Sequence, residues 1–207
     1  TKTQGRDTRL MGLFVGRERS VFEEAVHLSQ QCNLDLLAEP LEKVVVFLEP
    51  QEFKSTWLGN KAIYRTRMAM ADGGELIVLA PGVRSFGEDP GIDRLIRTFG
   101  YQKRLEVLRL TKEHRELAEN LSVAAHLIHG SADGRFRITY AVEHLSAAEI
   151  QGVCFHYLPY QEAAERYHPH QLSDGFNVLN GERVFFIRNP ALGLWALQKD
   201  FRKEEQQ

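Results

Sequence analysis

Short apolar runs alternate with segments of helical periodicity over most of this sequence. The runs at 44–48 and 75–80 are short and rich in β-branched residues, which predicts two buried strands. Between them, Asn60 is a suitable N-cap for a helix that starts at Lys61. The pair Gly73-Gly74 is expected to end that helix before the second strand. The pattern therefore predicts a strand, a crossover helix and a second strand that runs parallel to the first.

The loops that follow these two strands are the first candidate site. Parallel sheets bind ligands beyond the carboxyl ends of their strands, so the loops at 49–60 and 81–91 are predicted to face one crevice. These loops carry a mixture of polar, charged and aromatic side chains: Gln51, Lys54, Ser55, Thr56, Trp57, Asn60, Arg84, Glu88 and Asp89. The mixture suits an anionic, hydroxylated small molecule. The alternative is two polar surface loops without a ligand, because most loops are polar.

The rest of the chain continues the alternation of strands and helices. Before the central unit, the pattern predicts a strand at 10–15, a helix at 18–32 and a linker at 33–40. After it, the pattern predicts helices at 92–99 and 105–129, the latter broken near Leu110, and a strand near an edge at 136–142. The remaining predictions are a capping box at Ser146, a strand at 153–158, a helix at 161–167 and a strand at 183–187. This order predicts a single α/β domain at 10–198, with a mostly parallel sheet and helices on both faces, in three layers. Residues 1–9 are expected to be a disordered or artificial start, and 199–207 a charged, frayed tail.

Composition and charge exclude several classes of protein. The 207 residues include 26 Lys and Arg and 28 Asp and Glu, so the net charge of -2 gives no electrostatic case for nucleic acid or a membrane surface. No segment approaches the roughly 20 apolar residues that span a bilayer, and no signal peptide is visible. We therefore expect a cytoplasmic protein, with Cys32 and Cys154 as reduced core residues. Because the chain begins with Thr1, we expect it to be part of a longer protein.

Several familiar catalytic and metal-binding motifs are missing from the sequence. It contains neither a GxSxG nucleophile elbow nor a phosphate-binding P-loop. His126 and His129 lie three residues apart at the end of a predicted helix, where they could share a metal ion. The simpler interpretation is that they interact with the helix dipole, because no third ligand is close in sequence. We expect no metal site in this chain.

The basic side chains of the central unit are the stronger binding candidates. Lys61 and Arg65 lie one turn apart on one helix face, beside the free backbone amides of the first turn. Such a face favours a carboxylate or phosphate, although a solvated helix face is the alternative. Trp57 could stack on a ligand or cover the sheet.

The segment from Asn60 to Met70, followed by Gly73-Gly74 and an apolar strand, resembles the C-terminal domain of the nickel-dependent lactate racemase family. The resemblance extends from about Leu10 onward, and Ile63-Tyr64-Arg65 is its sharpest part. The family pattern has glutamine where this chain has Arg65, and lysine where it has Met68. Arginine can bind a carboxylate or hydroxyls, whereas methionine cannot replace the lysine. The departure disfavours lactate and favours a larger substrate, such as a sugar acid.

The resemblance implies a domain that orients an anionic hydroxy acid against a nickel-pincer nucleotide held by an N-terminal domain of the same protein. It implies part of a 2-hydroxy-acid racemase or sugar-acid epimerase, with this chain inactive by itself and without bound cofactor. The expected substrate contacts are Lys61, Arg65, Asn60, Lys54, Trp57 and Arg84. Two alternatives remain: a non-catalytic module that binds small anions, and a sugar-acid oxidoreductase domain, which lacks the expected GxGxxG motif.

Overall fold

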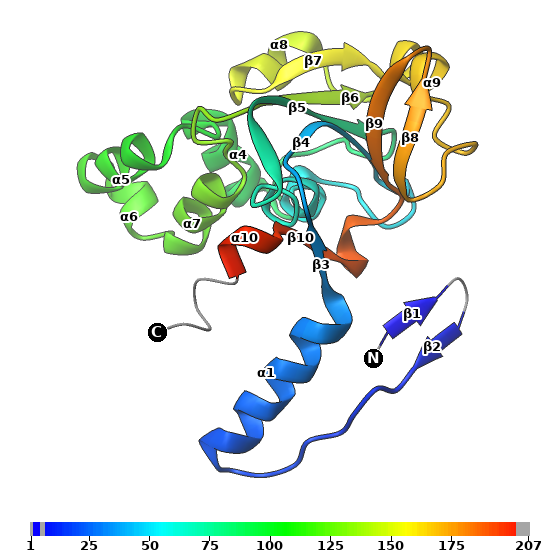
Figure 1. Cartoon of the computed structure of the whole chain (residues 1–207). Coiled ribbons are helices and arrows are strands. Elements are labelled where there is room, and N and C mark those ends of the chain that lie inside the picture. The colour runs from blue at the N-terminus through cyan, green and yellow to red at the C-terminus, as the bar shows by residue number, and fades with distance from the viewer. Residues whose placement is uncertain (1, 5–6, 202–207) are drawn as a thin grey trace.

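The computed structural model describes residues 2–4 and 7–201, and its centre is a six-stranded sheet with the order β7-β6-β5-β4-β9-β8 (Figure 1). The strands are β4 (Leu41–Phe47), β5 (Met70–Ala80), β6 (Arg137–Val142), β7 (His156–Pro159), β8 (Gly175–Leu179) and β9 (Glu182–Ile187). Neighbouring strands from β7 to β9 are parallel, and β8 is antiparallel to β9. The predicted mostly parallel α/β sheet is therefore confirmed.

The central strand β4 explains why its sequence is a continuous apolar run. Val44 and Val46 pack into the core on one face of the sheet, whereas Val45 and Phe47 pack into the core on the other. A strand that is buried on both faces needs apolar side chains at every position. Each fully buried side chain of this size contributes about 1.5–3 kcal/mol to folding relative to an exposed one.

Helices cover both faces of the sheet and complete the three predicted layers. One face packs against α2 (Thr56–Gly59), α3 (Lys61–Tyr64), α4 (Pro90–Phe99), α5 (Arg104–Glu113), α6 (Arg115–Ala118), α7 (Leu121–His129) and α8 (Ala147–Gly152). The other face packs against α9 (Tyr160–Tyr167), through Ala163 and Tyr167. The capping box at Ser146 forms as predicted, since Ser146 and Glu149 bond to each other's backbone.

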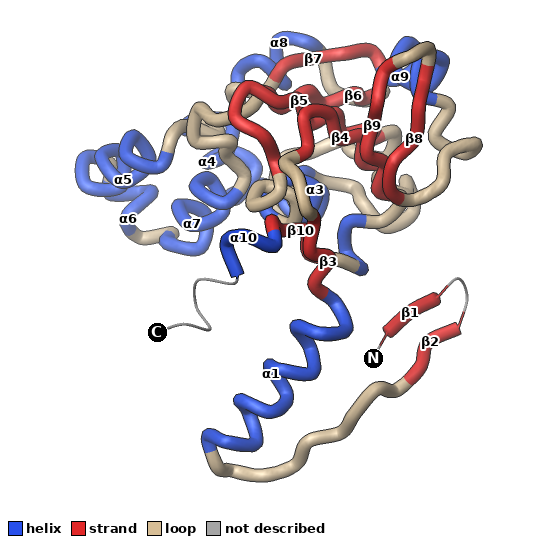
Figure 2. The backbone as a smooth tube through the Cα atoms, in the orientation of Figure 1, coloured by secondary structure: helices blue, strands red, loops and turns tan. Residues whose placement is uncertain are grey.

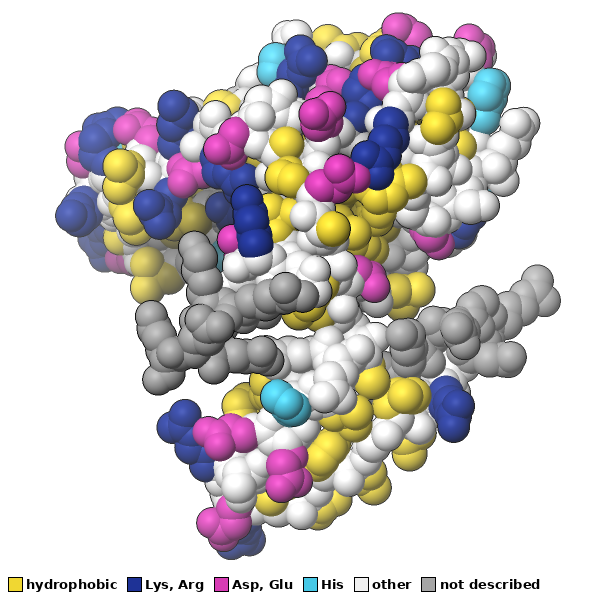
Figure 3. All heavy atoms as spheres, in the orientation of Figure 1, with side chains coloured by type: hydrophobic (Ala, Val, Ile, Leu, Met, Phe, Trp, Pro, Cys, Tyr) yellow, Lys and Arg dark blue, Asp and Glu magenta, His cyan; other side chains and the backbone are white. Residues whose placement is uncertain are grey.

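The N-terminal part of the chain forms an arm that extends away from the sheet (Figure 1). It comprises a hairpin of β1 (Lys2–Gln4) and β2 (Asp7–Arg9), an irregular segment, and α1 (Arg19–Asn33), which has no buried residue. Apolar side chains are exposed along the arm (Figure 3); Leu13, Val15 and Phe22 are 77%, 84% and 68% exposed. The arm joins the body through β3 (Leu34–Leu37), which pairs in parallel with β10 (Leu194–Leu197). Two short helices flank β10: the 3-10 helix η1 (Pro190–Leu192) precedes it, and α10 (Gln198–Phe201) follows it.

The predicted strand at 10–15 is wrong, and with it the first predicted strand–helix–strand step. Residues 10–16 form no strand and pack along α1 instead. A Cβ at Gly12 would lie 2.5 Å from Leu28, and one at Gly16 would lie 2.8 Å from Val21. Glycine at these two positions therefore lets the segment pack closely against side chains of α1.

The helix predicted from Lys61 to the glycine pair is also wrong in its extent. α3 ends at Tyr64, and β5 begins at Met70 and continues through Gly73 and Gly74. The ladder between β4 and β5 shifts register beside these glycines, and Gly73 has a positive φ of 80°. The pair therefore accommodates a bulge within a strand and does not end a helix.

Other predictions need smaller corrections. The long helix at 105–129 breaks at His114 and again before Leu121. β6 is next to the edge strand β7, so it lies near an edge as predicted. The linker at 33–40 contains β3, and Cys154 is exposed, not in the core. Most of the predicted tail at 199–207, and residues 1, 5 and 6 of the predicted start, lie outside the described residues. No helix in the described part of the chain has the length and apolar character to cross a membrane.

Candidate functional site

The two loops predicted to share a crevice lie side by side after β4 and β5. The backbone N–H of Arg84 donates to the carbonyl of Lys54 at 2.9 Å. Ser55 and Ser85 form a parallel bridge, and the N–H of Trp57 donates to the carbonyl of Phe86 at 2.9 Å. The loops therefore behave as one unit at the carboxyl edge of the sheet.

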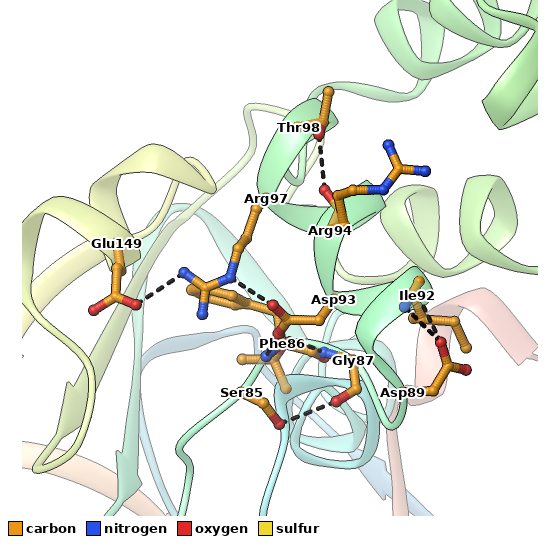
Figure 4. A network of polar contacts seen from close by, with 12 residues as sticks. Ser85, Phe86, Gly87, Asp89, Ile92, Asp93, Arg94, Arg97, Thr98 and Glu149 are labelled. Carbon is orange, nitrogen blue, oxygen red and sulfur yellow. Dashed lines mark hydrogen bonds and ion pairs between the residues drawn. The ribbon is translucent and has the colours of Figure 1, made fainter.

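Asp93 at the start of α4 fixes the second of these loops (Figure 4). Its Oδ1 accepts from the backbone N–H groups of Phe86 (2.6 Å) and Gly87 (3.2 Å). Its Oδ2 accepts from Arg97 at 2.6 Å, and Arg97 also donates to Glu149 of α8 at 2.8 Å. Burial alone would raise the pKa of Asp93, but the hydrogen bonds from Arg97 and the loop outweigh it and lower that pKa. Asp93 is thus a charged acceptor that holds the loop.

A cavity of about 400 Å³ opens at the carboxyl ends of β4, β5, β6 and β7. Its polar lining residues come from five separate segments: Glu49, Gln51, Lys54, Arg84, Glu143, His144, Tyr160 and His170. The structure thus places Lys54 and Arg84, two of the predicted contacts, at one cavity. Sequence reasoning missed Glu143, His144 and Tyr160, although each comes within two residues of a strand end, and it also missed His170.

Asn60 and Trp57 are placed elsewhere: Asn60 belongs to a buried polar network, and the half-buried Trp57 packs beside it. Tyr140 donates to Asn60 Oδ1 at 2.7 Å, and the Trp57 ring lies over His126 with their centroids 4.2 Å apart. The Tyr101 hydroxyl lies 3.0 Å from His126 Nε2. Burial lowers the pKa of His126 to about 4, with a smaller contribution from a nearby histidine, so this imidazole is neutral at neutral pH.

The direction of the hydrogen bonds in this network follows from counting protons. The Thr56 hydroxyl donates its single proton to the carbonyl of Phe86 at 3.0 Å, so it must accept from Tyr101 at 2.8 Å. Two groups approach Nε2 of His126: the Tyr101 hydroxyl and, at 3.5 Å, the side-chain amide nitrogen of Asn60. The network links α7 to the second loop. Within the described residues, its buried side-chain nitrogen and oxygen atoms all have hydrogen-bond partners.

Lys61 is the first residue of α3, and Arg65 directly follows this helix. α3 contacts η1, and Arg65 accepts a backbone hydrogen bond from Trp195 of β10. Figure 2 shows α3 beside β10. Arg65 Nη1 donates to the carbonyl of Gly193 at 3.2 Å, and Lys61 Nζ lies 5.8 Å from the centroid of the Phe53 ring. Neither cation forms an ion pair with a carboxylate of the described residues. The six predicted contacts therefore fall into three groups: the cavity, the buried network and the α3 surface.

A metal site is not evident among these groups. Within residues 2–4 and 7–201, no three His, Cys, Asp or Glu side chains are arranged to hold a metal ion. His126 is buried, neutral and part of the hydrogen-bonded network described above, so the predicted interaction with the helix dipole is not its role.

Comparison with solved structures identifies proteins with the same fold. No protein-family model and no curated protein matches this sequence. A structural-genomics target from Thermotoga maritima is 22% identical, with a TM-score of 0.66 over 86% of this chain and 42% of that chain. The lactate racemase apoprotein from Thermoanaerobacterium thermosaccharolyticum is 11% identical, with a TM-score of 0.59 over 86% of this chain and 40% of that chain. This chain thus spans less than half of either protein, and it shares its fold with part of a lactate racemase.

Proposed function

We propose that this chain is the substrate-orienting domain of a racemase- or epimerase-type protein that acts on 2-hydroxy acids. The observation that carries the proposal is the pair of cations on the α3 surface, Lys61 and Arg65, which lack carboxylate partners in the described structure. They occur where the sequence resembles lactate racemases, in a fold that a lactate racemase also has. A carboxylate ligand would supply the missing negative charge.

Arg65 is suited to bind the carboxylate group. One of its N–H groups is used by the carbonyl of Gly193, which holds the guanidinium in place, and the remaining donors are available to a ligand. Lys61, one turn earlier, adds a second positive charge on the same face. Binding of this kind would fix the position of the 2-hydroxy carbon, and orientation is the part of the chemistry assigned to this chain.

The nickel-pincer nucleotide belongs to another domain in this proposal. Bound there, it would accept and return the hydride of the substrate carbon. The described residues of this chain offer no metal-ligand set, so none of the cofactor's chemistry is assigned to them. The chain is accordingly expected to have no racemase activity by itself.

The position of Met68 bears on which hydroxy acid is bound. Its side chain is 40% exposed and carries no charge, so it cannot donate to a substrate oxygen. A small substrate such as lactate would depend on few contacts, whereas a sugar acid has further hydroxyls for neighbouring groups. We therefore propose a sugar acid in preference to lactate.

The test is a titration of this chain with D-gluconate and with both lactate enantiomers, followed by NMR and calorimetry. Arg65→Ala should weaken gluconate binding about tenfold or more, the loss expected for a charged hydrogen bond of about 1.5–3 kcal/mol. Arg67→Ala removes a neighbouring cation and is the matched control. Wild-type affinity in Arg65→Ala would remove Arg65 from the site and the proposal with it.

A further inference from the structure

The cavity at the carboxyl edge and the α3 surface belong to different sides of the sheet. Phe47, which lines the cavity, belongs to the core that packs on α9. Tyr160, the first residue of α9, lines the cavity as well. Ala62 and Ile63 of α3 belong to the core on the opposite face. The cavity therefore shares no lining residue with the surface formed by Lys61 and Arg65 and needs a separate explanation.

Close backbone packing gives the cavity a fixed shape. A Cβ at Gly82 would lie 2.6 Å from both the Cα and the carbonyl oxygen of Pro50, so only glycine allows the two loops to approach this closely. The hydrogen bond from Arg84 N–H to the carbonyl of Lys54 joins the same two loops. On the other side, the rings of Phe47 and His170 make an edge-to-face contact at 5.4 Å.

The cavity is lined by two cations that form no ion pair within the described residues, Lys54 and Arg84. Lys54 donates to the backbone carbonyl of Pro50, and its side chain is half-buried. Arg84 is exposed. Neither forms an ion pair with any carboxylate of the described chain, although Glu49 and Glu143 line the same cavity. Two cations of this kind favour a ligand with a carboxylate or phosphate group.

The remaining polar groups suit hydroxyls. Glu49 and Glu143 are exposed carboxylates, which can only accept hydrogen bonds when ionised. Burial raises the pKa of Tyr160, and the charges of Glu143 and Glu49 raise it further, so the phenol stays protonated and can donate. All three groups line the same cavity.

We propose that this cavity is a second binding site, for a small polyhydroxylated anion whose carboxylate or phosphate contacts Lys54 and Arg84 and whose hydroxyls donate to Glu49 and Glu143. Its volume of about 400 Å³ is at the small end of the range of roughly 300–1,000 Å³ found for ligand pockets, which suits a single sugar unit. The carboxyl ends of parallel strands are also where such folds bind ligands. The site stands independently of the proposed hydroxy-acid site on α3, because the two share no residue.

The experiment titrates the labelled chain with D-gluconate and D-glucose 6-phosphate, and with D-glucose and inorganic phosphate as comparison ligands. At least one of the two sugar anions should shift the amides of the cavity loops and bind at least tenfold tighter than glucose or phosphate. Lys54→Ala and Glu143→Gln should each weaken that binding tenfold or more. Lys112→Ala and Glu24→Gln, which replace exposed residues on α5 and α1, are the matched controls.

Each outcome decides between sites as well as ligands. Loss of binding in Lys54→Ala with full binding in Arg65→Ala supports this cavity, and the reverse pattern supports only the α3 surface. Phosphate that binds as tightly as the sugar anions would overturn the hydroxyl contacts. Equal affinity in Lys54→Ala, or no binding at millimolar concentrations by folded wild-type protein, would overturn the proposal. Circular dichroism of each variant confirms that its fold is intact.

Discussion

Two polar clusters in this molecule are built in opposite ways. The network of Asn60, Tyr101, Tyr140 and His126 is inside the core, and in the described structure no fully buried side-chain nitrogen or oxygen lacks a partner. The cavity at the carboxyl edge is open to solvent and contains cations without carboxylate partners. A buried group without a partner costs free energy, so a satisfied network stabilises one structure. Unpaired charge at a surface is available to a ligand. The difference separates residues that hold the fold from residues that can bind.

The largest expected effect is on the buried network. Asn60→Leu removes the acceptor of Tyr140 and leaves that hydroxyl buried without a partner, so the free energy of unfolding should fall by about 2–4 kcal/mol. Urea denaturation measures this change. Adding Tyr140→Phe to that variant should recover part of the loss, because the unpaired hydroxyl is then gone. A loss below about 0.5 kcal/mol in Asn60→Leu would show that the network does not stabilise the fold.

A pH dependence of intermediate size should arise from His126. Its pKa is lowered to about 4 in the folded state from an ordinary value of 6.5, so the unfolded state binds more protons between these values. Stability is therefore retained above the ordinary pKa and lost as the pH falls toward 4. We expect this group to contribute a loss of about 2–3 kcal/mol over that range. Urea denaturation at several pH values should show a shallower slope for His126→Gln than for wild type; an unchanged slope would contradict the buried neutral histidine.

The smallest expected effect is on stability at the cavity. Lys54→Ala and Arg84→Ala remove charges that form no ion pair in the described structure, so each should change the free energy of unfolding by less than about 0.5 kcal/mol. Thermal and urea denaturation of both variants measure this. A loss above about 1.5 kcal/mol would place these cations among the structural residues and remove the contrast between the two clusters.

The sequence predicted the parts of the fold that depend on local pattern. The run at 44–48 is apolar because it is buried on both faces, and Ser146 and Glu149 form a capping box because their spacing matches one helical turn. The pairing of β3 with β10 joins residues about 160 positions apart, such as Leu34 and Leu194, and neither strand alternates clearly. Gly73-Gly74 was misleading because the same residue type ends helices and allows bulges.

The candidate site was harder to predict for a geometric reason. Loop sequence shows that Lys54, Trp57 and Asn60 are close along the chain, but not which side of the sheet each reaches. Within those few residues, Lys54 lines the cavity, whereas Asn60 is buried in the core and the half-buried Trp57 packs against it. His170 reaches the cavity from a loop more than a hundred residues later, and no local pattern indicates that contact.

The position of β4 between β5 and β9 has a consequence for synthesis on the ribosome. Val45 pairs with Ile77 on one side and with Phe186 on the other. One edge of β4 therefore stays unpaired until the ribosome has synthesised β9, some 140 residues later. Until then a run of valines presents free backbone groups, the kind of edge that pairs with other chains. Nascent chains halted before β9 should therefore be prone to aggregation, and early shielding of that edge by a chaperone should raise the yield of folded protein.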